Sequence, residues 1–549
     1  MTAGRGRARR RIAAALVASA AAALLALASA GCGSSSDPAP ARADVDWPWF
    51  GGTATGTRSS SLDEIDRGNV GRLGVAWSLD VAPQAALWET YPVVVGRTMY
   101  VTTNEGQVLA LDATTGARRW TYTPDVDLLV GGALEGPAVH RGVTVAGGRV
   151  FLATHDDHLI ALDAATGRPE WDVRVADPRT GATQNSPPAY LDGRVFVGSA
   201  GADAGVRGFV AAYDAATGRQ RWRFWTVPAP GQDWMPEGKA GGGGHVWMPP
   251  TVDPATGTVY AGTGNRSPAI TSAPRTGCDE WVDATIALDA RTGRLKWGHS
   301  EQCGDVRDMD SGQPPAVFPV RRAGAVRSTV GHANKDGTYW LLDAATGREV
   351  ARSAPLVPRS LKRPSAAGAR VCPGALGGVA YSPAAVQGIT VFQPAVAQCM
   401  TYLTTAGAAR RGPQPFVQVG GGIAQPIPGV PATGVMVALD AATARVRWRR
   451  AMPAPMVGGA LATAGGLVFG GSDDGRLYAF DAATGRIAWR GNVGLAFGSA
   501  PLTYRIGGTQ YVAVAAGGSS LASLTGARVG ARLVVLKLGG RPLRPVPPR

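Results

Sequence analysis

Short runs in which apolar and polar residues alternate follow one another along most of the chain. Residues 148–175, GRVFLATHDDHLIALDAATGRPEWDVRV, contain several such runs, separated by clusters of Asp, Gly and Thr. A period of two is typical of β-strands, whereas a helix would need a period of about 3.6 residues. Beyond residue 45 almost no stretch keeps the helical period. The pattern therefore predicts an all-β protein built from short strands.

One hairpin motif, ALDAATGRxxW, recurs along the chain. Seven copies occur, with the aspartate at positions 112, 163, 214, 289, 343, 440 and 481. Each copy is typical of a strand that ends at Asp, a tight turn in which Gly can take a positive φ, and a second strand. The second strand carries a Trp in six copies, and Ala351 takes its place in the fifth.

The spacing of these copies predicts the architecture. Successive aspartates are 41 to 97 residues apart, which is enough for one four-stranded sheet with loop insertions. Sheets repeated around an axis bury their faces against each other and protect their edges. Seven copies give seven blades, and an eighth closes if GARLVVLKL (530–538) pairs with VGRLGVAWSLD (70–80), where Trp77 would dock. We expect an eight-bladed β-propeller over residues 46–538 and a disordered Pro-rich tail at 539–549.

The N-terminus predicts export. Five arginines precede an acid-free apolar run over residues 12–30, as in a secretion signal. The end of this run, LASAGC, resembles the lipobox of bacterial lipoproteins. That resemblance implies a signal peptide at 1–31, a lipid on Cys32 and a flexible tether over 32–45. A plain signal peptide or a membrane helix is the alternative.

The charge does not point to nucleic acid. The chain has 55 Lys and Arg against 40 Asp and Glu, for a net charge of +15. Only five of the basic residues are Lys, and no basic run outside the signal exceeds a few positions. We expect a solvated, Arg-rich surface rather than a nucleic-acid footprint.

Four cysteines other than Cys32 can pair in an oxidising compartment. Three pairings are possible, and proximity in sequence favours Cys278 with Cys303 and Cys372 with Cys399. Neither pair has the spacing of a zinc site. No C-x-x-C-H motif occurs, so we expect no covalently attached c-type haem.

The hairpin motif resembles the tryptophan-docking motif of the quinoprotein dehydrogenase-like propellers, over essentially all of residues 46–538. Scaffolding lipoproteins of outer-membrane assembly share that motif, so function depends on the loops. Seven loop segments resemble, in the same order, methanol and ethanol dehydrogenases that use pyrroloquinoline quinone (PQQ): WETYPVVV, HRGVTV, GSAGADAGVRGFVAAYD, GGGHVWMPPTVDP, GTGNRSP, GDVRDMDSG and NKDGTYWLLD.

This resemblance implies a set of site residues. Asp308 would be the general base, and Trp247 would be the flat surface on which PQQ stacks. A calcium or lanthanide ion would polarise the quinone, and such hard cations need oxygen ligands. The expected metal ligands are Asp203, Asn265, Asp308 and Asp310, and the expected PQQ-binding residues are Glu89, Arg141, Asn185, Trp247 and Lys335. In this family an aspartate at the position of Asp310 is associated with lanthanide use. The alternative for this segment is a solvated acidic loop containing Asp305, Asp308 and Asp310.

Several positions depart from the family pattern. Asp203 replaces a metal-binding Glu, and Glu135 with Gly136 replaces an adjacent cysteine pair that covers PQQ in many members. Ala380 and Tyr381 replace an Asn-Trp pair that usually lines the pocket. These differences leave the substrate open and suggest a more open site.

The sequence favours an exported, membrane-tethered, PQQ- and metal-dependent alcohol dehydrogenase. It would oxidise a small or polymeric alcohol and pass electrons to a separate acceptor such as a cytochrome c or a quinone. The alternative is a non-catalytic propeller lipoprotein that binds partner proteins as an assembly scaffold.

Overall fold

The computed structural model describes residues 43–82, 87–127, 139–201, 205–233, 242–404, 417–419 and 421–543. The predicted signal peptide, Cys32, Asp203 and the Glu135–Gly136 pair lie outside these residues, as does the end of the tail. Among the described residues, no helix is long and apolar enough to span a membrane.

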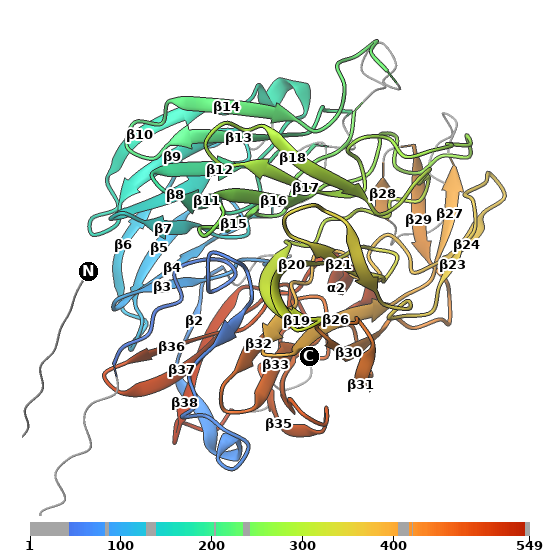
Figure 1. Cartoon of the computed structure of the whole chain (residues 1–549). Coiled ribbons are helices and arrows are strands. Elements are labelled where there is room, and N and C mark those ends of the chain that lie inside the picture. Colours follow the sequence, from blue (N-terminus) through green and yellow to red (C-terminus); the bar gives the residue numbers. More distant parts are fainter. Residues whose placement is uncertain are drawn as a thin grey trace, which may run out of the picture. The chain divides into compact units, whose positions relative to one another are not determined.

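Among the described residues, eight sheets form the blades, each with four antiparallel strands, and the sheet of the seventh blade gains a fifth strand. Figure 1 shows their arrangement. The first two contain β3 (Val93–Val95), β4 (Thr98–Thr102), β5 (Val108–Asp112) and β6 (Arg118–Tyr122), then β7 (Thr144–Ala146), β8 (Arg149–Ala153), β9 (His158–Asp163) and β10 (Pro169–Arg174). The next two contain β11 (Ala189–Leu191), β12 (Arg194–Val197), β13 (Phe209–Asp214) and β14 (Gln220–Trp225), then β15 (Thr251–Asp253), β16 (Thr258–Gly262), β17 (Ala284–Asp289) and β18 (Leu295–Ser300).

The fifth and sixth blades contain β19 (Ala316–Arg322), β20 (Ala325–Ala333), β21 (Tyr339–Asp343) and β22 (Glu349–Arg352), then β25 (Ala385–Gln387), β26 (Thr390–Ala397), β30 (Thr433–Asp440) and β31 (Val446–Met452). The seventh contains β32 (Ala460–Thr463), β33 (Leu467–Gly471), β34 (Arg476–Asp481) and β35 (Ile487–Asn492), and β1 (Ser59–Ser60) adds to it in parallel. The eighth contains β36 (Leu502–Ile506), β37 (Thr509–Ala516), β38 (Arg532–Leu538) and β2 (Leu73–Asp80).

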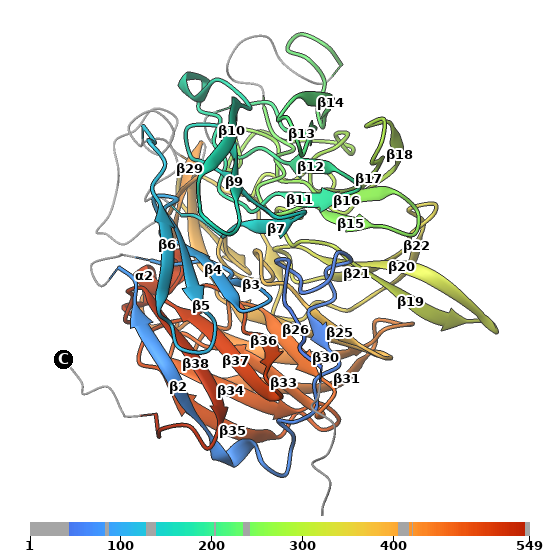
Figure 2. The same cartoon turned by 90° about the vertical axis from the view of Figure 1, so that its left-hand side faces the viewer.

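The predicted closure of the eighth blade is confirmed. Strand β2 pairs antiparallel with β38, and the two lie side by side at the blue and red ends of the colour scale in Figure 2. First strands of successive blades also contact each other, as β3 contacts β7 and β7 contacts β11. The regular part of the chain is therefore an eight-bladed propeller, as the repeat predicted.

A ninth sheet, which we call the inserted sheet, was not predicted; its strands come from the segment before the sixth blade and from the segment between β26 and β30. Its strands are β23 (Ser360–Leu361), β24 (Ala369–Cys372), β27 (Met400–Thr404), β29 (Gly422–Pro426) and β28 (Val417–Val419). Helices are short: the α-helix α2 (Ser520–Thr525) and the 3-10 helices η1 (Val70–Arg72) and η2 (Pro178–Thr180). The favoured cysteine pairs, Cys278–Cys303 and Cys372–Cys399, are both disulfides, and the second joins β24 to the segment before β27.

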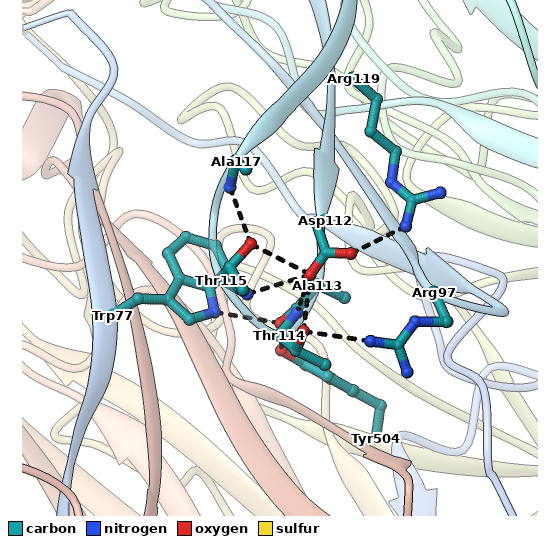
Figure 3. Close-up of polar contacts among 9 residues, drawn as sticks. All are labelled: Trp77, Arg97, Asp112, Ala113, Thr114, Thr115, Ala117, Arg119 and Tyr504. Carbon is teal, nitrogen blue, oxygen red and sulfur yellow. Dashed lines mark hydrogen bonds and ion pairs between the residues drawn. The ribbon is translucent and has the colours of Figure 1, made fainter.

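Tryptophan docking joins successive blades. The Trp77 indole N–H donates to the carbonyl of Ala113 in the turn of the next blade, at 3.0 Å (Figure 3). In the same turn Asp112 accepts hydrogen bonds from the backbone amides of Thr114 and Thr115. Equivalent indole bonds of 3.0 to 3.1 Å join Trp120 to Ala164, Trp171 to Ala215, Trp222 to Ala290, Trp297 to Ala344 and Trp448 to Ala482. These six tryptophans thus each lock one blade onto the next.

The glycine of each docking turn lies under the preceding blade's indole. A Cβ at Gly167 would come within 2.5 Å of the Trp120 ring. The exception is the sixth blade, whose turn has Ala444 at a φ of +55°. The blade before it carries Ala351 in place of Trp, and both alanines belong to one apolar cluster. Because no indole covers this turn, the space that glycine provides is not needed there.

Candidate active site

The predicted site residues that the structure describes come from loops of five different blades. Glu89 precedes β3, Arg141 precedes β7, Asn185 precedes β11, Trp247 precedes β15, Asn265 follows β16, Asp308 and Asp310 precede β19, and Lys335 lies in the β20–β21 turn. Loops that meet at one end of a propeller can bring such distant residues together.

Lys335 joins the two predicted aspartates. Its Nζ lies 2.9 Å from Asp308 Oδ2 and 2.9 Å from Asp310 Oδ2. All three side chains are buried. Burial alone would lower the pKa of Lys335, but the two carboxylates outweigh it and raise that pKa above its usual value. The ammonium is therefore fixed as a cation, and the carboxylates converge on it.

Asp305 shapes the loop that carries the aspartates. Its carboxylate accepts hydrogen bonds from the amides of Arg307 and Met309, and it pairs with the Arg307 side chain. Asp308 then takes a left-handed φ of +62°, which costs about 1–2 kcal/mol for a residue with a Cβ. Asp305, Asp308 and Asp310 are 4%, 6% and 6% exposed. The alternative of a solvated acidic loop is therefore wrong.

A buried Glu301–His332 pair anchors the end of this loop. The Nδ1 of His332 lies 2.8 Å from Glu301 Oε1, and its Nε2 lies 2.7 Å from the carbonyl of Gln313. These two contacts fix the orientation of the buried imidazole ring. Burial would raise the pKa of Glu301, but His332, Thr285 and Ser311 together lower it. The network fixes the residues directly after Asp310.

The GTGN segment after β16 holds Asp310 from the other side. The amide N–H of Asn265 donates to Asp310 Oδ1 at 2.7 Å. A Cβ at Gly264 would lie 3.1 Å from the same oxygen, so glycine leaves room for the carboxylate. Asn265 is itself buried, next to the carboxylate–lysine cluster.

A cavity of about 160 Å³ adjoins Lys335, and Glu89, Arg141, Trp247 and Tyr381 also line it. Arg141 Nη2 donates to Glu89 Oε2 at 2.7 Å. The guanidinium carbon lies 5.2 Å from the Trp247 ring centroid and 5.3 Å from that of Tyr381. A charged wall thus meets two aromatic rings.

The family described as "Glucose/ethanol/alcohol dehydrogenase, beta-propeller domain", denoted PQQ, matches residues 47–373 and 432–512. The chain belongs to the PQQ-dependent alcohol dehydrogenase family. This confirms the resemblance that the loop segments indicated.

Individual members of the family match along most of their length. The quinohemoprotein alcohol dehydrogenase of Comamonas testosteroni is 34% identical over 84% of this chain and 71% of its own. The structure of the quinohemoprotein alcohol dehydrogenase ADHIIG of Pseudomonas putida matches with a TM-score of 0.82 at 30% identity, covering 92% of this chain and 82% of its own. A structure of a europium-containing methanol dehydrogenase matches with a TM-score of 0.79 at 26% identity, covering 90% and 98% of the two chains.

The cavity fits the family's cofactor. Nε and Nη1 of Arg141 are buried, and among the described residues they have no hydrogen-bond partner. Carboxylates are the natural partners of a guanidinium fork, and PQQ is a flat tricarboxylate. Trp247 offers a ring face beside this fork, and Lys335 offers a second cation. These donors are of the kind that a flat tricarboxylate needs.

The metal-ligand set is only partly described. Asn265, Asp308 and Asp310 provide amide and carboxylate oxygens, which suit a hard cation. Asp203 lies outside the described residues, and within them no group of three or more His, Cys, Asp or Glu side chains could hold a metal. Asn185 is placed beside the site through its backbone, since its carbonyl accepts from the Arg141 amide at 3.0 Å.

Tyr381, which the sequence marked as a departure from a pocket-lining pair, does line the cavity. Sequence reasoning missed two other features of this region. The Glu301–His332 pair has no local sequence signal. Asp283 is buried with Oδ1 unpaired among the described residues, and burial together with Asp305, Asp310 and Asp308 raises its pKa well above the usual value.

Proposed function

We propose that this protein oxidises an alcohol with PQQ and a bound cation, on the outer side of the cytoplasmic membrane. The observation that carries this proposal is the convergence of Asp308 and Asp310 on Lys335, beside a cavity with an unsatisfied arginine fork and a tryptophan face. Family membership supports the reaction class.

Asp308 is the proposed general base, as the family resemblance implies, and its carboxylate lies 2.9 Å from Lys335 of the cavity wall, on a loop that Asp305 fixes. It would take the hydroxyl proton of the alcohol, a role worth about 10²–10⁴-fold in rate. Lys335 would hold the Asp308 carboxylate in place and keep it ionised until substrate arrives. When bound, PQQ supplies the quinone that accepts the two electrons of the alcohol.

The remaining residues would bind and orient. Arg141 and Lys335 would meet the oxygens of PQQ, Glu89 would hold Arg141, and Trp247 would support the ring plane. Asn185 would fix the Arg141 backbone. Asp203, Asn265, Asp308 and Asp310 would provide oxygens to the cation, and the fourth ligand, Asp310, favours a lanthanide over calcium because a higher charge wants more anionic oxygens.

The cellular setting is part of the proposal. Two disulfides support folding in an oxidising compartment. Residues 1–31 would be removed, a lipid on Cys32 would anchor the chain through a tether ending near residue 45, and the propeller would extend over 46–538. Electrons would pass to a separate cytochrome c or quinone, and the alcohol could be small or polymeric.

A PQQ titration tests the proposal. The chain from residue 33 would be stripped of metal, then titrated with PQQ in the presence of calcium or lanthanum, following tryptophan fluorescence. Saturable quenching that requires a cation is expected, because Trp247 lies in the cavity wall. If neither cation supports PQQ binding, the enzyme proposal fails and a protein-binding scaffold becomes the better explanation.

A further inference from the structure

Four blades share one type of turn between their second and third strands. In each turn, the backbone N–H of the first residue donates a hydrogen bond to the carbonyl of the residue four positions later. The carbonyl of the same first residue accepts a hydrogen bond from the N–H of the residue three positions later. These first residues are Thr103, Thr154, Asn334 and Ser472. The second positions of the four turns are therefore equivalent, and they hold Asn104, His155, Lys335 and Asp473. At this position the fifth blade presents its active-site lysine.

Asp473 occupies that position without any counter-charge. It is 6% exposed, and neither carboxylate oxygen has a hydrogen-bond partner of good geometry among the described residues. The next residue is a contrast, because Asp474 pairs with Arg476 at 2.9 Å and accepts from the Tyr478 hydroxyl at 2.5 Å. Within the described chain, Asp473 thus has the Phe497 amide near it but no cation to offset its burial, and a buried charge is costly unless something pairs with it.

A separate pocket of about 360 Å³ lies against Asp473, and we refer to it as the Asp473 pocket. It is formed where the seventh blade, the inserted sheet and the end of α2 meet. Gln398 also lines it, is 5% exposed and has an unpaired Oε1. The walls are mostly apolar, with Pro426, Val430, Pro431, Pro455, Leu524 and Ala527 among them.

The chemistry of this lining selects a class of ligand. Two residues with unpaired acceptor oxygens call for a hydrogen-bond donor, and no Lys, Arg or His side chain lines the pocket among the described residues. A hard metal ion would need six or more oxygens, as calcium does, and the proline and aliphatic walls do not provide them. An ammonium group carries both donors and positive charge, and an alkyl body suits the apolar walls.

We propose that the Asp473 pocket binds a small organic ammonium ion, whose N–H groups meet Asp473 and Gln398 while its alkyl part packs on the proline-rich wall. The site is distinct from the candidate active site and does not depend on PQQ or on the proposed reaction.

The ionisation of Asp473 would make this binding depend on pH. Burial raises the pKa of Asp473 to about 7, with a further rise from Asp474, while the Phe497 amide opposes the shift. Asp474 is the neighbouring charged group that acts on it. A carboxyl with that pKa is mostly protonated at about pH 6 and mostly ionised at about pH 8. Affinity for an ammonium ion should therefore rise about tenfold between these two values.

Calorimetry with n-butylammonium tests the proposal on the chain from residue 33, with and without PQQ and cation. Saturable binding at about pH 8 is expected under both conditions. Asp473→Asn should weaken it at least about tenfold, since the side chain keeps its size but loses its charge. Butyltrimethylammonium, which has the charge but no N–H, should bind at least about tenfold more weakly.

Matched variants separate this site from others. Asp474→Asn changes the neighbouring carboxyl outside the pocket and should leave affinity within about twofold. Binding should also survive Asp308→Asn, and its loss there would place the ammonium in the candidate active site and overturn the proposal. If Asp473→Asn does not fold, Gln398→Leu gives a second test, with severalfold weaker binding expected. Absence of saturable binding, or equal binding by the wild type and Asp473→Asn, would also overturn it.

Discussion

The turns of Lys335 and Asp473 have the same backbone pattern but opposite electrostatic situations. Lys335 is buried between two carboxylates at 2.9 Å, so its charge is balanced within the chain. Asp473 is equally buried, but it has no cationic partner among the described residues and only the Phe497 amide opposes its burial. A propeller repeats its scaffold in every blade, whereas the loops opposite each turn decide what that position does. The fifth blade therefore has a completed cluster, and the seventh has an incomplete one.

The strongest test of the completed cluster is Asp308→Asn. The variant keeps the side chain's size but cannot accept the substrate proton, so kcat for alcohol oxidation should fall about 10²–10⁴-fold. Steady-state kinetics with saturating PQQ and cation measure it, and circular dichroism checks that the fold is retained. Wild-type turnover would remove Asp308 from the mechanism.

Lys335→Met should break the balance of the fifth-blade turn. Asp308 and Asp310 would be left as two buried, adjacent carboxylates, and loss of a buried partner destabilises by about 3–5 kcal/mol. Urea unfolding of the metal-free protein at neutral pH measures the loss. The exposed Lys362 is the matched control, since Lys362→Met should change stability by less than about 0.5 kcal/mol. If Lys335→Met and Lys362→Met changed the free energy of unfolding equally, the pairing of Lys335 with Asp308 and Asp310 would not stabilise the fold.

Asp473→Asn should increase the free energy of unfolding at neutral pH, whereas Lys335→Met should decrease it. Asp473 has a pKa of about 7 in the folded protein, which lies above the pKa of an Asp in the unfolded chain. Between about pH 4 and pH 7, Asp473 is therefore protonated in the folded protein and ionised in the unfolded chain, so folding takes up a proton. Stability conferred by the protonated form is present at low pH and is lost as the pH rises through this window. Above pH 7 the variant should therefore be more stable than the wild type by about 4 kcal/mol, and near pH 4 the two should be equal. Urea unfolding across this range measures the difference, and a constant gap at every pH would rule out the titration.

The tryptophan-docking turns also contain two equivalent positions in different surroundings, Gly167 and Ala444, and both are purely structural. Gly167→Ala places a Cβ within 2.5 Å of the Trp120 ring at a φ of +73°, so a loss of about 1–3 kcal/mol is expected. Ala444 occupies the same turn position without an indole above it. Ala444→Gly should stay within about 1 kcal/mol of the wild type. Thermal unfolding of the two variants measures these changes. Similar losses of stability would mean that packing against the indole is not the reason why glycine occupies this turn position.

These regions also differ in how far the sequence could predict them. The blades and the β2–β38 closure follow from local signals, namely a period of two, the Asp-to-Gly turn and the docking Trp. The inserted sheet could not be predicted in this way, because its strands of two to five residues come from both sides of β25 and β26. Short strands without a repeated turn motif leave no pattern to count.

The residues of the candidate site also divide into those that the sequence predicted and those that only the structure shows. Asp308, Asp310, Asn265 and Lys335 were predicted through family resemblance, and the structure brings them into contact. The Glu301–His332 pair depends on a fold contact between two blades, so neither residue has a local signature. Asp473 lies in an SDDG turn that resembles any solvated turn in the sequence. Its burial arises from the inserted sheet and α2, which only the structure brings next to it.

The smallest expected effect concerns the second carboxylate of the completed cluster. Asp310 shares Lys335 with Asp308 and is held by the Asn265 amide, so one of its oxygens remains close to the proposed cation ligands. Asp310→Ala should weaken lanthanum-supported PQQ binding by about tenfold while calcium-supported binding changes less, since a trivalent ion gains more from each anionic oxygen. Parallel fluorescence titrations with the two ions measure the ratio. Equal losses with both ions would mean that Asp310 supports Lys335 and the loop rather than selecting the metal, and the contrast with the single carboxylate of Asp473 would then concern charge balance alone.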